Sequence, residues 1–257
     1  MESEEKYNVK VLEKTLNILK CFTSLKPEWT LSDLCKELKM NRTTIYRILT
    51  TLSAHDFITV SEKSGKYKLG SVFVVLGATV LSEMDLRKSA GYHLKKLSEI
   101  SGETAHLCMY YNMTAVNIDI YDSPQENKIA PRIGKELSLH ASSPGKIFLA
   151  NFCDDDLEEY IQKGLAPSTQ YTCTSPDEIK KMVKKIRQEK LAYDLRESTD
   201  DRSGISAPIF NYKNQVIAAI GAVGPYARFE KNLETIAKQV KNSAHSISKE
   251  MGYMGEF

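Results

Sequence analysis

Long hydrophobic runs are missing from this sequence of 257 residues. Nowhere does it reach the roughly 18 consecutive apolar residues that a membrane-spanning helix requires. The first residues, MESEEKYNVK, are acidic where a signal peptide would be basic, and no apolar stretch follows them. We therefore expect a cytoplasmic protein with no membrane partner.

Cysteine is scarce, and its spacing is uninformative. The five cysteines form no Cys-x-x-Cys pair and stand far apart, at Cys21, Cys35, Cys108, Cys153 and Cys173. An odd number at such spacing fits neither a disulfide framework nor a zinc finger. The sequence therefore predicts reduced, buried thiols.

Complete enzyme motifs are also missing. The stretch Ser143-Pro144-Gly145-Lys146 resembles the end of a phosphate loop, but the upstream glycine is absent. Ile147 stands where a Ser or Thr would bind magnesium, so we interpret the stretch as the start of a helix. The run Asp154 to Asp156 lacks the alternating ligands of a calcium loop and is interpreted as acidic charge at a helix N-terminus.

Four further residues could be drawn together as a metal site or as a nucleophile and its base: His106, Cys108, Asp119 and His140. They lack ligand spacing such as His-x-x-x-His, which favours structural roles in strands and loops. We expect no catalytic residue, no metal and no cofactor.

The composition is that of an ordinary globular protein, with 42% hydrophobic and 26% charged residues. The chain shows no internal repeat and no low-complexity tract, and its length suits two unequal domains. We expect a first domain over 8–70, a linker helix over 71–86 and a second domain over 87–252.

Positive charge is concentrated in the first of these segments. Residues 8–70 carry eleven Lys and Arg against six Asp and Glu, while residues 71–257 carry 23 against 24. A modest basic surplus on a small domain is a weak indication of nucleic-acid binding.

The first segment shows the pattern of a winged helix-turn-helix. Apolar residues repeat at helical spacing over 9–22, and Thr30 with Asp33 forms a capping-box pattern before a second helix that runs to about Leu38. Asn41 is a natural N-cap for a third helix. Two β-prone runs, 57–60 and 66–69, then predict a hairpin. Together with the short turn between the second and third helices, this is the element order of a winged helix-turn-helix.

The third helix carries the side chains of a recognition helix on the face opposite its apolar stripe. The candidate DNA-binding residues are Asn41, Arg42, Thr43, Thr44, Tyr46, Arg47 and Thr50, with Lys63, Lys66 and Lys68 on the hairpin. The alternative for the helix residues is that they only form a solvated polar surface. Lysines on a hairpin can likewise serve only to protect an edge strand from pairing with another chain.

The rest of the sequence predicts a connecting helix over 70–86 and then a mixed domain. The apolar surface of the connecting helix suits a partner subunit as well as a core. After it, we expect strands at about 104–111, 115–121, 203–210 and 216–223, and helices at about 87–100, 144–151, 155–162, 176–190 and 229–250. A hairpin turn from Asn211 to Gln215 makes at least part of the sheet antiparallel. The fold class is α+β.

The chain from about Val11 to about Ser248 resembles the IclR-type family of bacterial transcriptional regulators. The resemblance rests on TLSDLCKELKMNRTTIYRILTTL, SGKYKLGSVFVVLG, GKELSLHASSPGKIFLA, IRQEKLAYD and SGISAPIFNYKNQVIAAIGAVGP. It implies a homodimer or homotetramer that binds double-stranded operator DNA. It also implies a GAF-like, mostly antiparallel effector-binding domain for a small organic acid or an aromatic metabolite.

The resemblance places the effector pocket at seven positions: Leu137, Ser143, Pro144, Asp194, Gly204, Gly221 and Val223. Family members that grip a carboxylate often have Cys or Ser where this chain has Gly204, Gly221 and Val223. Fewer polar anchors and more room predict a larger or less polar ligand. For Asp194, a surface carboxylate or a partner of Arg187 or Arg196 is an equal alternative.

These observations favour a ligand-responsive DNA-binding transcriptional regulator, either a repressor or an activator, that is not an enzyme. The alternative is a sensor enzyme or metal-dependent hydrolase with an N-terminal docking module.

Overall fold

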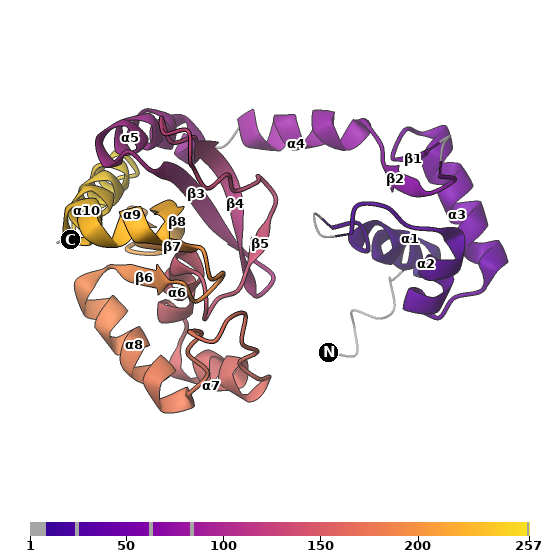
Figure 1. Ribbon diagram of the computed structural model, residues 1–257. Coiled ribbons are helices and arrows are strands. Elements are labelled where there is room, and N and C mark those ends of the chain that lie inside the picture. The colour runs from indigo at the N-terminus through magenta and orange to yellow at the C-terminus, as the bar shows by residue number, and fades with distance from the viewer. Residues whose placement is uncertain (1–8, 24–25, 62–63, 83–84, 256) are drawn as a thin grey trace. The chain divides into compact units, whose positions relative to one another are not determined.

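The computed structural model describes residues 9–23, 26–61, 64–82, 85–255 and 257 (Figure 1). Lys63, one of the expected wing residues, lies outside this part of the chain. The chain divides into two compact units, residues 1–83 and 84–257, and each is described by itself. Among the described residues, no helix combines the length and the apolar character needed to cross a membrane.

The first unit has the predicted order of three helices and a hairpin. Its elements are α1 (Lys10–Lys20), α2 (Leu31–Leu38), α3 (Arg42–Ala54), β1 (Ile58–Val60), β2 (Tyr67–Leu69) and α4 (Val72–Ser82). The expected connecting helix over 70–86 thus begins two residues later than predicted, and residues 83 and 84 of the predicted range lie outside the described residues. Residues 85 and 86 belong to the next helix of the chain.

Local capping sets the ends of α2 and α3. The Thr30 hydroxyl accepts a hydrogen bond from the backbone N–H of Asp33, and the Asn41 side chain accepts one from Thr44. Between them, Lys39 ends α2 in the left-handed conformation with φ 50°. These caps produce the tight turn that the sequence predicts.

Apolar residues from every element of the helix-turn-helix and hairpin form one core. Its most deeply buried side chains are Ile18, Leu34, Ile45, Leu49 and Ile58. The wing is tied to this core because Trp29 exchanges two backbone hydrogen bonds with Tyr67 of β2. The wing also depends on Gly70, where a Cβ would lie 1.9 Å from the Asp56 carbonyl oxygen.

The apolar stripe of α1 is only partly used inside this unit. Ile18 is fully buried, but Val11, Leu12 and Leu16 are 47–59% exposed. The helix forms as the apolar stripe predicts, but part of that stripe faces away from the core of this unit.

The second unit is a six-stranded antiparallel sheet with helices on both faces. The strands lie in the order β5-β4-β3-β8-β7-β6. They are β3 (Thr104–Tyr111), β4 (Thr114–Tyr121), β5 (Glu136–Leu137), β6 (Ala192–Leu195), β7 (Arg202–Phe210) and β8 (Val216–Pro225). The helices are α5 (Asp85–Ser101), α6 (Ser143–Ala150), α7 (Asp154–Gln162), α8 (Pro176–Glu189), α9 (Tyr226–Phe229) and α10 (Leu233–Glu250).

Two hydrophobic cores lie on the two faces of this sheet. The helices α5, α9 and α10 cover one face, and α6 packs on the other face, with α8 against it. The α+β fold with a mostly antiparallel sheet is confirmed. The helix expected over 229–250 is instead α9, a short 3-10 turn at Glu230–Asn232 and then α10.

The expectation of buried thiols holds for Cys108 only. Cys153 is exposed at the start of α7, and Cys21, Cys35 and Cys173 are partly exposed, all as free cysteines. Burial raises the pKa of the Cys108 thiol, which keeps it protonated and unreactive.

Candidate nucleic-acid interface and ligand cavity

The outer side of α3 presents a continuous polar surface. Arg42, Thr43, Arg47 and Thr50 are exposed on it, and Tyr46 is 54% exposed. The apolar residues of the same helix, Ile45, Ile48, Leu49 and Leu52, are buried. The helix therefore separates a core face from a face that is free to meet another molecule.

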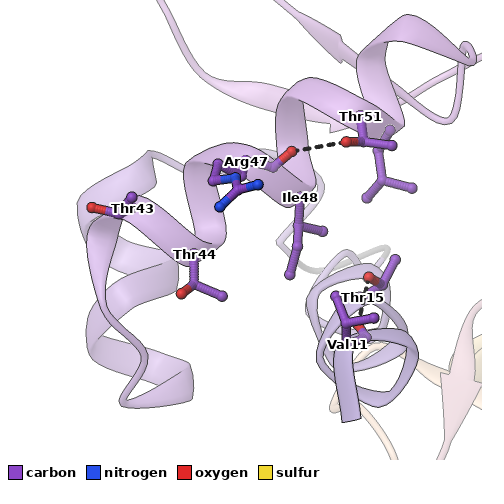
Figure 2. Close-up of a pocket in the computed structure, with 8 residues that line it drawn as sticks. Val11, Thr15, Thr43, Thr44, Arg47, Ile48 and Thr51 are labelled. Atoms are coloured by element: carbon purple, nitrogen blue, oxygen red, sulfur yellow. Dashed lines mark hydrogen bonds between the residues drawn. The ribbon is translucent and has the colours of Figure 1, made fainter. Parts of the chain in front are cut away.

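A hollow of about 380 Å³ separates α3 from α1 (Figure 2). Val11 and Thr15 line it on the α1 side, and Thr44, Arg47 and Thr51 line it on the α3 side. The Arg47 side chain thus lies at the border between this hollow and the outer surface of α3.

A second hollow of about 510 Å³ lies on the wing side of α3. Arg42, Thr43 and Tyr46 line it together with Gly65 and Tyr67 of the hairpin and with Leu31 of α2. The recognition-helix candidates therefore face the wing, as a winged helix requires. Sequence reasoning missed Tyr67.

Two residues that were expected to contact DNA form hydrogen bonds within the protein. The Thr50 hydroxyl donates to the Tyr46 carbonyl oxygen at 2.9 Å, and Asn41 uses its Oδ1 atom to cap α3. Thr44 is only half exposed. Because a phosphate can only accept hydrogen bonds, Thr50 must rotate away from Tyr46 before it can bind one.

The wing lysines share one carboxylate partner. Lys68 Nζ lies 2.8 Å from Glu28 Oε1, and Lys66 Nζ lies 4.0 Å from Glu28 Oε2. The hydrogen bond from Lys68 is the main cause that holds the pKa of Glu28 below its ordinary value. The positive charge of this part of the wing is therefore partly neutralised.

The second unit contains a small cavity, here named the Arg202 cavity. Its volume is about 30 Å³, which is room for roughly two water molecules. It is lined by His106, Asn117, Pro131, Lys135, Leu137, Ser142, Ser143, Pro144, Asp194, Ser198, Arg202, Gly204 and Val223. Six of the seven expected effector residues are among them. The seventh, Gly221, is not.

Gly221 offers no room for a ligand. A Cβ at this position would lie 2.4 Å from Ser206 Oγ and 2.5 Å from both His106 Nε2 and the Ile205 carbonyl oxygen. Two polar side chains already occupy the space, so the expectation of a roomy pocket here is wrong.

These side chains belong to a buried polar row. Ser206 Oγ lies 2.9 Å from Ser143 Oγ and 3.5 Å from His106 Nε2. Burial, and secondarily the charge of Arg202, lowers the pKa of His106 to about 4. His106 is therefore neutral at pH 7 and acts in the cavity wall as a hydrogen-bonding group.

The cavity is also more cationic than the sequence led us to expect. Lys135 and Arg202 both line it, and sequence reasoning missed both. Burial lowers the pKa of Lys135, and the nearby charges of Arg202 and Arg132 lower it further. Gly204 and Val223 contribute no hydroxyl to this cavity, as expected from the sequence, but two cations and several hydroxyls from other positions line it.

Asp194 is 5% exposed, so it is not a surface carboxylate. Its Oδ1 atom accepts hydrogen bonds from the backbone N–H groups of Glu197 at 2.8 Å and Ser198 at 3.1 Å. The Ser198 hydroxyl donates to Oδ2. Asp194 therefore shapes the turn that closes one side of the cavity, and burial raises its pKa despite these bonds.

The arginines that were the alternative partners of Asp194 bind elsewhere. Arg187 donates to the carbonyl oxygens of Ala150 and Phe152, while Arg196 donates to Asp200 and lies against the rings of Tyr171 and Tyr226. The turn after Asp194 is held in addition by Lys146, a buried side chain that pairs with Glu197.

The enzyme-like motifs have structural surroundings. Ser143–Ala150 is a helix capped by Ser142, and Asp154, Asp155 and Asp156 lie in the first turn of α7, as interpreted. The four scattered candidates are not brought together. Cys108 contacts Asn117, Asp119 pairs with Arg87, and His140 contacts Tyr160. Among the described residues, no three His, Cys, Asp or Glu side chains are grouped to hold a metal ion.

Two family models match the chain. Residues 78–249 match the C-terminal part of the bacterial transcriptional regulator IclR, and residues 11–62 match the IclR helix-turn-helix domain. The chain is 26% identical to the HTH-type transcriptional regulator XynR of Escherichia coli, over 95% of this chain and 98% of that protein.

Solved structures share the fold across both units. An IclR transcriptional regulator from Alicyclobacillus acidocaldarius has a TM-score of 0.84 at 24% identity, covering 95% of this chain and 99% of that one. An IclR homologue from Microbacterium hydrocarbonoxydans, complexed with 4-hydroxybenzoate, has a TM-score of 0.80 at 20% identity, covering 94% and 98%. With the family matches, these findings show that the chain belongs to the IclR-type family of bacterial transcriptional regulators.

Proposed function

We propose that this chain is a cytoplasmic, ligand-responsive regulator that binds operator DNA as a homodimer or a pair of dimers. The α3 helix enters the major groove, and a compact organic anion in the Arg202 cavity changes the affinity for DNA. The ligand must bind the DNA-competent and DNA-incompetent arrangements with different affinities, because only such a difference can regulate.

The exposed face of α3 carries the DNA-binding part of this proposal. Arg42, Tyr46 and Arg47 project from a helix whose opposite face is buried, beside a hairpin, which is the arrangement that places a recognition helix in the major groove. We expect Lys66 and Lys68 to contact the DNA backbone, although their pairing with Glu28 reduces the positive charge that they offer to the phosphates.

Arg47→Ala tests this role. If Arg47 reads a guanine with two hydrogen bonds, the variant loses about 1–3 kcal/mol of operator binding and relaxes base choice at one position per half-site. Mobility-shift titration against the neighbouring intergenic DNA measures both. Lys181→Ala removes an exposed cation of the second unit and is the control. Wild-type affinity in Arg47→Ala would remove Arg47 from the interface.

The convergence of Arg202 and Lys135 on one small cavity carries the ligand-binding part. The positive charge of Arg202 is one cause that lowers the pKa of Lys135, and a bound anion would oppose this effect, while the Ser143 hydroxyl can donate to an oxygen of the anion. Leu137, Pro144, Gly204 and Val223 supply the apolar part of the wall. The complex of a protein of the same fold with 4-hydroxybenzoate supports a small organic acid as the class.

A panel of small carboxylic acids, screened by thermal shift and then by operator binding, tests the ligand class. Arg202→Gln should abolish the response to the acid that works on the wild type and keep operator binding. Arg132→Gln, an exposed cation outside the cavity, should respond normally. A wild-type response in Arg202→Gln would place the effector elsewhere.

The enzyme alternative has little support in the cavity. His106 and Ser143 are the nearest approach to a base and a nucleophile, but they contact each other only through Ser206. A general base works best when its pKa is near the operating pH, and that of His106 is about 4. The named relatives are transcriptional regulators, which favours regulation without turnover.

A further inference from the structure

The hollow between α1 and α3, here named the α1–α3 groove, contains one charged side chain (Figure 2). Its lining residues are Val11, Thr15, Thr43, Thr44, Arg47, Ile48, Thr51 and Leu52, so no carboxylate is among them. Within the described part of the chain, the Arg47 side chain has neither a hydrogen bond nor an ion pair. The groove therefore presents one uncompensated positive charge.

The remainder of the groove is mainly apolar. Ile48 and Leu52 are 7% and 8% exposed, and Val11 is 59% exposed beside them. The hydroxyls of Thr15 and Thr51 donate to carbonyl oxygens of their own helices at 2.8 Å and 3.0 Å, so they have no proton left to donate to a ligand. An open groove of this kind suits a peptide segment that brings an apolar side chain and negative charge.

The segment that precedes α1 has this chemistry. Residues 1–8, MESEEKYN, lie outside the described residues, and their sequence contains three glutamates against one lysine, with one tyrosine. Glu5 stands four residues before Val9, the N-cap of α1. Four extended residues span up to about 14 Å. Packed helices lie roughly 8–10 Å apart, axis to axis, so the glutamates can reach α3.

We propose that residues 2–7 occupy the α1–α3 groove of their own chain and compete with DNA for Arg47. The Tyr7 ring covers the apolar floor, and the carboxylates of Glu4 and Glu5 face the guanidinium group, as in other charge-assisted hydrogen bonds. Arg47 cannot pair with the segment and with DNA at once, so the two bind in alternation. The competition, unlike the docking itself, rests on the proposed function.

Deletion of residues 2–7 tests the competition. The apparent affinity for DNA is reduced to the fraction of molecules whose groove is empty. If the segment occupies the groove in roughly 70–90% of molecules, its deletion raises the affinity for the intergenic DNA about three- to tenfold. Mobility-shift titration of the wild type and the deletion variant measures this ratio. Equal affinity in the two proteins would overturn the competition.

A control is needed because removal of negative charge near DNA raises affinity wherever the charge lies. In an Arg47→Ala background, the same deletion should change DNA affinity by less than about twofold, since the residue that both ligands need is gone. Glu37→Gln, an exposed acid of α2 outside the groove, should raise affinity less than Glu5→Gln does. An undiminished effect of the deletion in Arg47→Ala would show that only general charge is at work.

The docking itself is tested without DNA, by photo-crosslinking of the full-length protein with p-benzoylphenylalanine in place of Tyr7. We expect crosslinks within one chain to lining residues such as Val11, Thr15 or Thr51, mapped by mass spectrometry. Addition of the intergenic DNA should suppress them. Crosslinks within the groove would support docking even if no DNA were bound, so failure of the proposed function is distinguishable from failure of this inference.

Two crosslinking results would overturn the proposal. Crosslinks confined to residues outside the groove would show that the segment lies elsewhere. Crosslinks that join two chains would assign the groove to a second copy of the protein. Leu12 and Leu16 do not line the groove, so a second copy can cover these exposed residues of α1 without displacing the segment.

Discussion

At the scale of single residues, burial decides which groups around the Arg202 cavity are charged. His106 is 4% exposed, and desolvation lowers its pKa, whereas desolvation raises the pKa of Asp194. Both shifts favour the neutral form of the group. Burial also lowers the pKa of Lys135, so desolvation acts against the charged form of all three groups.

The His106 shift predicts a loss of stability in mild acid. Its pKa is about 4 in the folded protein and 6.5 in the unfolded chain, so as pH falls below 6.5 only the unfolded state gains the proton. This group should lower the free energy of unfolding by about 2 kcal/mol between pH 7 and pH 5. Urea denaturation of the wild type and of His106→Gln at both pH values measures it.

We expect the wild type and His106→Gln to differ in how their free energy of unfolding changes with pH. His106→Gln should lose this part of the pH dependence, whatever its stability at pH 7. His55→Gln, an exposed histidine of the first unit, should keep it. Equal pH dependence in the wild type and His106→Gln would mean that His106 takes up its proton in the folded state.

A residue of the candidate site could be predicted where a sequence motif identified its role, and could not be predicted where only tertiary packing brings it to the site. Leu137, Ser143, Pro144, Gly204 and Val223 lie in motifs that the resemblance identified, and the structure brings them together. Lys135 lies in one of these motifs and Arg202 directly precedes another, but a cation in a sequence is usually solvated, so neither was expected in the cavity. Only tertiary packing places these two beside the same cavity.

At the scale of elements, long periodic segments were predictable and short ones were not. The four long strands and the helix-turn-helix lie within a few residues of the prediction. Strands β5 and β6 have two and four residues, too few for an alternation pattern. The break between α9 and α10 likewise has no clear start or stop signal.

Two glycines of the second unit have different surroundings, which predicts opposite effects on stability when each is replaced by alanine. At Gly221 an added Cβ meets the Ile205 backbone, whereas at Gly91 in α5 it meets nothing within 4 Å. Gly221→Ala should lower the free energy of unfolding by about 2–3 kcal/mol, because the packed core resists overfilling. Gly91→Ala should raise it by about 0.5–1 kcal/mol, because glycine weakens a helix interior.

Chemical denaturation of the two variants beside the wild type checks both signs. Gly221→Leu would be chosen from the sequence alone to block a ligand pocket. It should instead prevent folding, because the core around Gly221 has no room for a side chain. A folded Gly221→Leu protein of wild-type stability would show that β8 and its neighbours can move apart at low cost.

At the scale of the whole molecule, exposed apolar surface indicates self-association. Val74 and Val75 of α4 are 72% and 64% exposed, and the outward residues of α1 add to this surface in the first unit. Such surface is rarely left open in a monomer. We expect Val75→Asp to shift the protein toward folded monomer in sedimentation, while Tyr212→Asp, at a similarly exposed position of the second unit, leaves assembly unchanged.

Binding of DNA by the proposed homodimer would have a consequence for the operator. Two related half-sites should be protected about 34 Å apart or at multiples of this spacing. Affinity should fall steeply with salt, and the logarithmic slope should decrease by about one for each phosphate contact removed from the protein. If Arg42 binds phosphate and Arg47 reads a base, Arg42→Gln reduces the slope and Arg47→Ala does not. Salt-insensitive binding would contradict both roles.

The small volume of the Arg202 cavity limits how fast a ligand can enter. With room for roughly two water molecules, the cavity would have to widen before it could hold the proposed organic acid, for example by movement of the turn held by Asp194 and Lys146. If the proposed acid binds only the widened form, the observed association rate should level off as ligand concentration rises instead of increasing in proportion to it. The regulator would respond to sustained changes in its effector and ignore brief ones, because the opening rate sets the response time.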